Sequence, residues 1–512
     1  MKYKLIIYLL LLSKILFAQT NFDKQWMSGG GYNYKTSFNT TQATNILACS
    51  TKFRYFSGGH SNICDSNGHL ILCSDGYNIY DSNLNYIDGG DTLVPKLFYN
   101  DQDGFSTYSQ NSIFLPFDSG IYYLITPAMS DVHYTDYIIN AVADSLSRAC
   151  FDLLLYHKID MMANGGLGKV VQKAIPLLTN VRTDRVRMIA CKHANGKDWW
   201  LLKQATDTNM IYTFLVKQDT IEGPFIQGFA EPHFGKERGW ANNYGQSVFN
   251  KEGTMYFTGC PFNSKLFYAN FNRCTGIFSN NKVINIPIDS VGTFYEDHTF
   301  TGCAFSNNSR FLYIIKVGNI WQYDLNDPDS NTAWVRIAQN LIDLPNYQVS
   351  VLAYLGADHK IYIGNKNGLG NNMSVIDNPD VKGVGCGFCA QCFIFPNIGV
   401  QSPPCMPNYD LGADSSICWA VGVHEVVKIV DDWVVYPNPS SNKIFIKNAK
   451  YQSKKELYNS VGQLILTTKE NEIDVSRYAN GMYYIRAGNL TKKNNYRVIC
   501  IYLCNPLIRV YP

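Results

Sequence analysis

Between about residues 21 and 410, short apolar runs alternate with clusters of Gly, Asn and Asp. Helical periodicity is almost absent, and the runs are rich in β-branched and aromatic residues, which predicts short strands joined by tight turns. A loose unit recurs, in which a turn precedes two apolar strands and a third that ends in an aromatic and a polar residue. The turns that open the visible copies are Ser66-Asn67-Gly68, Ser119-Gly120, Asn195-Gly196-Lys197, Lys251-Glu252-Gly253, Asn307-Asn308-Ser309 and Ala357-Asp358-His359.

The later turns are spaced roughly 50 residues apart, which is the period of four-stranded sheets repeated as propeller blades. The pattern therefore predicts an all-β chain with a six- or seven-bladed β-propeller over residues 21–405. We expect the closing blade to be shared between Trp26-Met27 and the Phe395-Pro396-Asn397 end.

The N-terminus has the pattern of a secretory signal peptide. Met1-Lys2-Tyr3-Lys4 is basic, Leu5 to Leu12 is apolar, and Ala18 is a small residue suited to the cleavage position. The apolar run is shorter than the ~20 residues that span a bilayer. We expect residues 1–18 to be removed and the mature chain to have no membrane span.

Composition narrows the class of protein further. The chain has 512 residues, with 46% hydrophobic and 17% charged residues, which is typical of folded domains. Its 44 Lys and Arg nearly balance 41 Asp and Glu, and no basic stripe is visible. This balance argues against nucleic acid as a partner.

Near the end, Val434-Val435-Tyr436-Pro437-Asn438-Pro439-Ser440-Ser441 opens a segment that resembles the type A C-terminal sorting domain of the type IX secretion pathway. Gly462 lies in an Asn-Ser-x-Gly-Gln hairpin, and Gly481 lies in an Asn-Gly-x-Tyr-Tyr strand, in the order of that family. The resemblance implies a small β-sandwich over residues 433–499 and the type IX machinery as a partner. It also implies a destination outside the cell or on the outer surface.

Two flanking segments complete the expected domain organisation. Residues 406–432 lack the strand pattern and are interpreted as a linker. Residues 500–512 form an apolar tail with Cys500 and Cys504 that departs from the family, whose members usually stop after the last strand.

The propeller segment carries a second resemblance. Asp160 to Lys173 and Lys192 to Trp200 are similar to stretches of a group of secreted propellers that often carry the same sorting domain. The fold of that group resembles WD-repeat and quinoprotein-like propellers. Such propellers host many functions, so the resemblance implies a fold and no activity.

Fifteen cysteines suit an oxidising compartment, in which disulfides persist. Cys64 and Cys73 flank the turn at Asn67-Gly68, and Cys260 and Cys274 are a second reasonable pair. The cluster Cys386, Cys389, Cys392 and Cys405 has spacings that would also suit a metal, but the compartment favours disulfides that staple the last blade. Connectivity stays open.

Other candidate motifs are weaker. Gly165-Gly166-Leu167-Gly168-Lys169 lacks the Ser or Thr of a phosphate-binding loop and is interpreted as a tight turn. Asp324, Asp327 and Asp329 alternate as calcium ligands do, but match no complete loop. No catalytic signature is present, and we assign no catalytic residue, metal or cofactor.

Export signals, fold and absent catalytic motifs favour a secreted or surface-attached binding or scaffold protein, adhesin-like, with an unknown protein or glycan ligand. One alternative is a propeller hydrolase of sugars or lactones, and another is a structural envelope protein without a ligand. The lining of the central channel discriminates between them: two carboxylates with a His favour the enzyme, and a merely polar or aromatic channel favours binding.

Overall fold

The structure is a computed structural model of the full chain, and it divides into two compact units, Met1–His424 and Glu425–Pro512. The expected signal peptide, residues 1–18, lies outside the described residues. The structure describes residues 21–30, 32–38, 43–49, 52, 54–56, 58–140, 150–206, 209–229, 245–260, 265–287, 300–316, 318–329, 331–341, 344, 350–365, 370–399, 402–414, 418, 434–436, 440, 442–447, 454–459, 463–479, 481–488 and 496–503.

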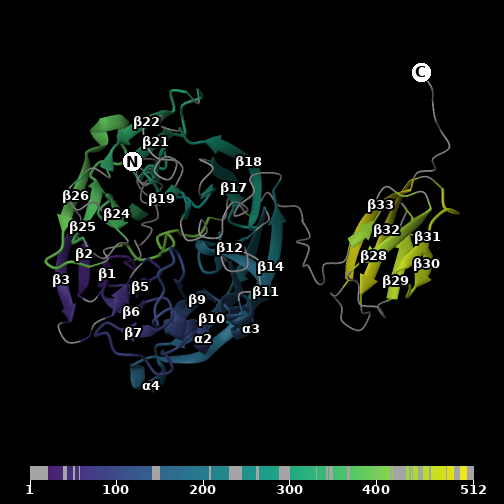
Figure 1. The fold of residues 1–512 in the computed structure, drawn as a ribbon, viewed down its shortest axis with the longest axis horizontal. Helices are drawn as coiled ribbons and strands as arrows, with labels where there is room; N and C mark the ends of the chain where they lie inside the picture. The colour runs from purple at the N-terminus through teal and green to yellow at the C-terminus, as the bar shows by residue number, and fades with distance from the viewer. Residues whose placement is uncertain are drawn as a thin grey trace, which may run out of the picture. The chain divides into compact units, whose positions relative to one another are not determined.

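The first unit is a β-propeller, in which antiparallel sheets stand around a common axis (Figure 1). The sheets near the N-terminus are β3-β2-β1-β4, with β1 (Gln25–Gly30), β2 (Asn33–Phe38), β3 (Ala43–Cys49) and β4 (Tyr55–Phe56), and β5-β6-β7, with β5 (Ser61–Cys64), β6 (Leu70–Ser74) and β7 (Ile79–Asp81). The later sheets are β15 (Ser247–Phe249) to β18 (Ile277–Asn285), β19 (Phe300–Phe305) to β22 (Trp334–Ala338) and β23 (Ser350–Leu355) to β26 (Phe388–Ile394). Their middle strands are β16 (Met255–Cys260), β17 (Lys265–Asn272), β20 (Phe311–Lys316), β21 (Ile320–Asp324), β24 (Ile361–Asn365) and β25 (Asn372–Ile376).

Between these groups lies one seven-stranded sheet, in the order β14-β13-β12-β11-β10-β9-β8. It exists because β11 (Lys169–Lys192) runs for 24 residues, pairing with β10 from Lys169 to Asp184 and with β12 mainly from Met188 to Lys192. The other members are β8 (Ile113–Pro116), β9 (Ile121–Ala128), β10 (Cys150–Asp160), β12 (Trp199–Ala205), β13 (Met210–Val216) and β14 (Ile221–Gly228). If this sheet is counted as one, the described part of the unit has six sheets. If it is divided within β11, the unit has seven.

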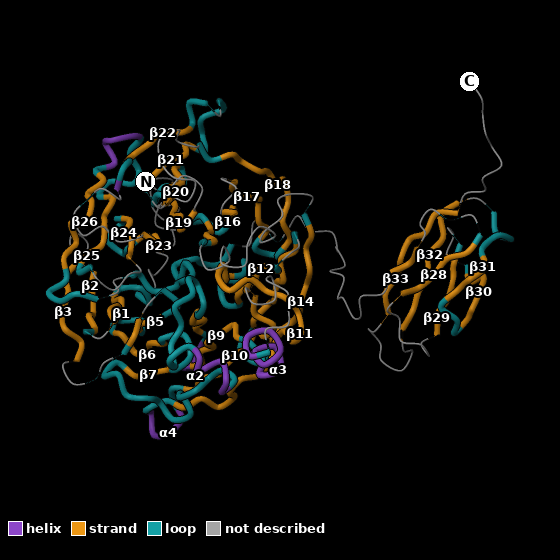
Figure 2. Tube along the Cα trace, in the orientation of Figure 1, coloured by secondary structure: helices purple, strands orange, loops and turns teal. Residues whose placement is uncertain are grey.

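Helical segments are short and lie at the periphery, where Figure 2 shows them in purple. They are α2 (Lys96–Asp101), η1 (Asp118–Gly120), α3 (Asp131–Tyr134), η2 (Thr135–Ile139), α4 (Ala163–Gly166) and η6 (Gly383–Cys386). None of the helices in the described residues is long and apolar enough to cross a bilayer.

The first and last sheets of the propeller meet through side chains. Tyr34 packs against Phe395 with ring centroids 5.4 Å apart, and its hydroxyl accepts a hydrogen bond of 2.6 Å from the side-chain amide of Asn397. The Trp26 and Tyr362 rings also meet, at 5.6 Å. In the described residues, the Phe395–Asn397 end therefore closes the ring through side chains. It adds no strand to the sheet that holds Trp26.

The second unit is a small β-sandwich of two sheets. One is β27 (Val434–Tyr436), β28 (Lys443–Lys447) and β31 (Glu472–Asp474), and the other runs in the order β30-β29-β32-β33, with β29 (Lys454–Tyr458), β30 (Leu464–Thr468), β32 (Gly481–Gly488) and β33 (Tyr496–Leu503). Ile444, Leu457, Ile473 and Ile485 are buried in one cluster between the sheets. Tyr436 ends β27 and Gly481 begins β32, whereas Pro437, Asn438, Pro439 and Gly462 lie outside the described residues.

The last strand continues past the expected domain boundary at Ile499. In β33, residues Cys500 to Leu503 pair with Tyr484 to Gly481 of β32 in unbroken antiparallel register. The first part of the expected tail, Cys500 to Leu503, is therefore part of a strand.

This register predicts the effect of truncation. A chain ending at Ile499 loses half of the β32–β33 pairing, so we expect the C-terminal unit to unfold at lower urea concentration than in the full chain. A chain ending at Cys504 keeps β33 and serves as the control, with an unchanged midpoint. Equal midpoints for the two truncated chains would contradict the pairing.

Candidate functional site

A buried segment that includes the start of the expected linker crosses the propeller. Residues 402–414, which we call the strap, cross the middle of the ring of sheets in Figure 1. Ser402, Cys405 and Tyr409 are at most 2% exposed. Cys405, Met406 and Tyr409 belong to the largest apolar cluster of the propeller. The expected linker at 406–432 therefore begins with residues that are integral to the propeller core.

Hydrogen bonds hold the strap to strands that are distant in sequence. The backbone N–H of Cys405 donates to the carbonyl of His60 (2.8 Å), and the Tyr409 hydroxyl donates to the carbonyl of Phe114 (3.0 Å). Lys192 donates to the carbonyl of Tyr409 at 3.4 Å. Each bond satisfies a polar group that burial would otherwise leave unpaired. Three prolines in the strap, at 403, 404 and 407, restrict its φ angles, and because proline has no backbone N–H these positions need no buried acceptor.

The far end of the strap passes closely over the turn at Gly196. This residue has φ +74°, and a Cβ added to it would lie 2.7 Å from the backbone nitrogen of Ala413. Only glycine permits both the left-handed conformation and this approach. The backbone N–H of Asp414 then donates to the carbonyl of Ala194 at 2.7 Å.

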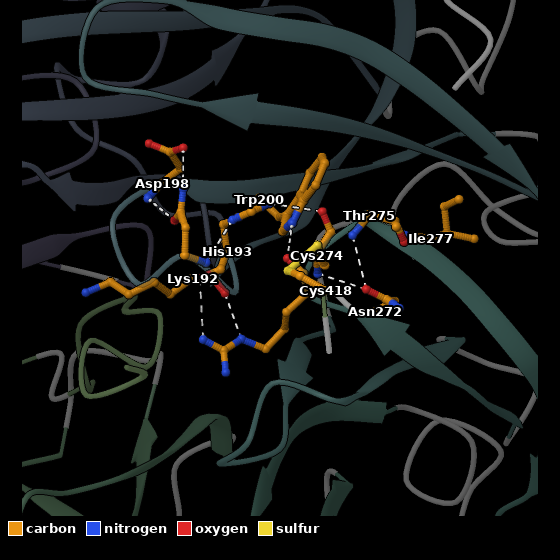
Figure 3. The surroundings of a disulfide bond; sticks show 11 residues. Lys192, His193, Asp198, Trp200, Asn272, Cys274, Thr275, Ile277 and Cys418 are labelled. Atoms are coloured by element: carbon orange, nitrogen blue, oxygen red, sulfur yellow. Dashed lines mark hydrogen bonds between the residues drawn. A yellow bond between two sulfur atoms is a disulfide. The ribbon is translucent and has the colours of Figure 1, made fainter. Parts of the chain in front are cut away.

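A disulfide fixes the chain just beyond the strap. Cys274 is bonded to Cys418, beside Trp200 and His193 (Figure 3). The neighbouring Arg273 donates to the carbonyl of Gly412 at 2.6 Å and to that of Lys192 at 2.9 Å. The bonded cysteines are 144 residues apart, and closing so long a loop contributes on the order of 5 kcal/mol in the chain-entropy account.

The strap lines one side of a cavity of about 430 Å³ in the propeller. This volume lies within the range of small-molecule sites. The wall is largely apolar and comes from β15, β19 and β23, while turns between inner strands supply a polar rim. The residues that line it are Asp23, Ile189, Ala190, Val248, Phe249, Asn250, Lys251, Ala304, Phe305, Ser306, Asn307, Ala353, Tyr354, Leu355, Gly356, Ala357, His359, Met406, Pro407, Asn408 and Asp410.

Two carboxylates, Asp23 and Asp410, are part of this lining. Burial raises the pKa of Asp23 to about 6, and the nearby negative charge of Asp410 raises it further than the Lys24 charge lowers it. The Asp23 Oδ1 atom is buried and has no hydrogen-bond partner among the described residues. Asp23 is therefore a carboxyl group that holds its proton at mildly acidic pH.

The charge of Asp410 also acts on Lys192. Burial lowers the pKa of Lys192 to about 8, against the opposing effect of the Asp410 charge. Its ammonium also stands 4.8 Å from the centre of the Trp199 ring. One carboxylate of the strap, Asp410, thus acts on both an acid, Asp23, and a base, Lys192, of the propeller.

The cation on the rim of the cavity, Lys251, already has hydrogen-bond partners. Lys251 donates to the side-chain oxygen of Asn307 at 2.8 Å, and its own carbonyl accepts from the Asn408 amide at 2.7 Å. His359 is exposed on the turn between β23 and β24. The cavity thus contains both carboxylates and a His, but no group of three such residues in the described ranges converges as a metal site would.

The structure forms neither of the two disulfides suggested by the sequence, Cys260–Cys274 and Cys64–Cys73. Cys274 pairs with Cys418 and not with Cys260, whose side chain lies outside the described residues. Cys64 and Cys73 are buried free thiols on neighbouring strands. Their sulfurs contact different partners, since the first donates to the Gln25 carbonyl and the second to that of Asp81.

The cluster near the last blade does not act as a staple. Cys389 is bonded to Cys392 within β26, whereas Cys386 and Cys405 are buried free thiols. Cys405 lies in the strap and donates to the Gly58 carbonyl at 3.3 Å. The four sulfurs of this cluster are thus divided between the outer strand and the core.

Two weaker sequence candidates are turns. Asn164 and Gly165 adopt left-handed conformations in α4. Arg310 donates to both carboxylate oxygens of Asp324, at 3.0 and 2.8 Å, and Lys382 lies 3.3 Å away. The hydrogen bond from Arg310 is the main reason that the pKa of Asp324 falls to about 2. This carboxylate is bound by cationic side chains.

Comparison with known proteins decides the role of the second unit. Residues 434–501 match the family model of the secretion system C-terminal sorting domain. The C-terminal unit is a type IX sorting domain. The protein is therefore exported through the type IX pathway to the cell surface or the outside. No curated protein matches the sequence.

Solved structures resemble the propeller only distantly. A candidate 6-phosphogluconolactonase from Bacteroides fragilis aligns with a TM-score of 0.40 and 10% identity, over 75% of this chain and 97% of that one. A protein from Lactobacillus plantarum gives 0.40 and 11%, over 74% and 98%. A second candidate 6-phosphogluconolactonase, from Bacteroides uniformis, gives 0.32 and 12%, over 88% and 97%. Likenesses at these scores carry no statement about activity.

The raised pKa of Asp23 predicts a pH-dependent stability. The folded state holds this proton more tightly than the unfolded state, so stability falls as pH rises from about 4 through 6. The side chain of the Asp23→Asn variant stays neutral at every pH, because an amide does not ionise in this range. We expect it to exceed the native protein in free energy of unfolding by about 1–3 kcal/mol at pH 7.5, and to differ little at pH 4.

Urea unfolding at both pH values measures this difference. Asp103→Asn, at an exposed carboxylate away from the cavity, is the matched control and should shift neither value. A gap between Asp23→Asn and the native protein that is the same at both pH values would contradict the assignment.

Proposed function

We propose that the exported propeller is a binding protein whose cavity takes a small ligand or the tip of a larger one, such as a sugar unit or a peptide side chain. The observation that carries this proposal is the cavity itself, with an apolar wall and a polar rim. Ligand sites commonly combine these features, since apolar area supplies affinity and a few polar groups fix orientation. Delivery by the sorting domain places such a site where glycans and peptides of the surroundings are accessible.

The strap supports a binding role for a physical reason. Met406, Pro407, Asn408 and Asp410 line the cavity from a segment that is bonded to the core on both sides. Its side of the cavity is therefore preorganised, which lowers the entropic cost of holding a ligand. An adhesin-like protein that must keep hold of its target benefits from that rigidity.

A hydrolase is the second candidate, and a specific observation favours it. Asp23 keeps its proton at mildly acidic pH while a second carboxylate, Asp410, shares the cavity. Carboxyl groups in unlike environments are the usual acid and base of glycoside hydrolysis. Together with His359 on the rim, this lining meets the channel criterion for an enzyme. Binding remains the leading proposal because a cavity suffices for it, whereas catalysis also requires a substrate placed between the two groups.

Filling the cavity tests the binding proposal. Ala357 lines it from the turn after β23, so Ala357→Trp should occupy the space that a ligand needs. On glycan and peptide arrays, we expect the native protein to give discrete hits and the variant to lose them at least tenfold in affinity. Val384→Trp, at a side chain 85% exposed on η6, is the control and should retain the hits.

Array hits that persist undiminished in Ala357→Trp, with unchanged thermal unfolding, would place recognition elsewhere and contradict the proposal. If a bound glycan is cleaved, Asp23→Asn separates the two candidates. Loss of turnover with retained binding would establish the hydrolase.

A further inference from the structure

An exposed disulfide lies on the outermost strand of the last sheet. Cys389 and Cys392 are bonded within β26, which occupies the end of the order β23-β24-β25-β26. Cys392 is exposed and Cys389 is half-buried. In the part of the chain that the structure describes, β26 pairs with β25 alone, so its outer edge faces away from the sheet.

This bond contributes little to the stability of the fold. A disulfide stabilises mainly by closing a loop in the unfolded chain, and the effect grows with loop length. Cys389 and Cys392 are 3 residues apart, compared with 144 for Cys274 and Cys418. The short bond ties no second strand and no second sheet. We therefore look for a role of the Cys389–Cys392 bond other than stabilising the fold.

The backbone around the pair is shaped by interactions that do not depend on the bond. The register between β25 and β26 shifts between Met373 and Val375, which leaves a bulge opposite Ser374. Gln391 occupies that bulge with φ +55°, and its backbone N–H donates to the Ser374 hydroxyl at 3.0 Å. Bulges re-aim side chains at sheet edges. The bulge and the hydrogen bond to Ser374 thus shape the backbone between the two cysteines without involving either sulfur.

We propose that Cys389–Cys392 is a thiol–disulfide exchange site that reacts with external thiols. The thiolate of the external molecule attacks the exposed sulfur of Cys392. The bond between the two protein sulfurs breaks, and Cys389 leaves as a thiolate that takes a proton from water. A second external thiol, as its thiolate, then attacks the mixed disulfide. This step releases an oxidised external disulfide and leaves a protein dithiol, so two thiols are oxidised for each protein disulfide reduced.

The other cysteines of the propeller provide an internal contrast. Cys64, Cys73, Cys150, Cys191, Cys303, Cys386 and Cys405 form no disulfide in the structure, and all seven are buried. Burial raises the pKa of the Cys191 and Cys405 thiols to about 12, which removes the thiolate needed for exchange. Among the cysteines whose side chains the structure describes, exchange should therefore favour the Cys389–Cys392 pair over these buried thiols.

The test uses the folded, exported chain without denaturant. Native protein is incubated with reduced glutathione in one arm and with a reduced, unfolded protein in the other, then quenched with acid and mapped by peptide mass spectrometry. We expect mixed disulfides and newly reduced thiols at Cys389 and Cys392 to form about tenfold or more faster than at Cys274 and Cys418. Reaction in the glutathione arm alone assigns the site to small thiols, and reaction in both arms extends it to protein thiols.

Two matched variants identify the attacked sulfur. With oxidised glutathione, Cys389→Ser leaves the exposed Cys392, which should form the adduct several-fold faster than Cys389 does in Cys392→Ser. Three results would overturn the proposal: a pair found unbonded in the exported protein, reduction no faster than that of Cys274–Cys418, or equal adduct rates in the two variants. Since none of these measurements involves the cavity, their outcome is independent of the proposed ligand.

Discussion

The strap is the constraint on which the rest of the propeller depends. A ring of sheets leaves inner strands facing an axis, and their apolar and polar groups need partners there. Residues 402–414 supply those partners by packing Cys405, Met406 and Tyr409 into the main apolar cluster. Backbone bonds at both ends and the Cys274–Cys418 bond hold the segment in place.

The cavity and its charges follow from this arrangement. Asp410 reaches the cavity because the strap carries it there, and its charge helps to raise the pKa of Asp23. The same residue opposes the effect of burial on the pKa of Lys192. A site built this way joins groups from the first and last parts of the propeller sequence. The sorting domain, by contrast, forms its own core and determines destination.

The sequence predicts features that depend on neighbouring residues, but it does not predict contacts between residues far apart in the chain. Met255-Tyr256-Phe257 and its repeats predict strands because alternation and turn residues are local signals. Tyr436 and Gly481 predict the sorting unit because motif order is also local. The strap has no such signal, since its part from Met406 onward lacks the strand pattern and is interpreted from sequence as a linker. The proximity of Asp23 to Asp410 and the bond between Cys274 and Cys418 arise from closure of the ring, which no local pattern encodes.

Hydrogen–deuterium exchange on the exported protein tests most directly whether the strap is part of the propeller core. The amides of Cys405 and Asp414 donate to His60 and Ala194. They should exchange as slowly as amides of the inner strands β19 and β23, because opening them requires opening of the core. Exchange at the rate of an unstructured peptide would show that the segment is a linker after all and would contradict the account.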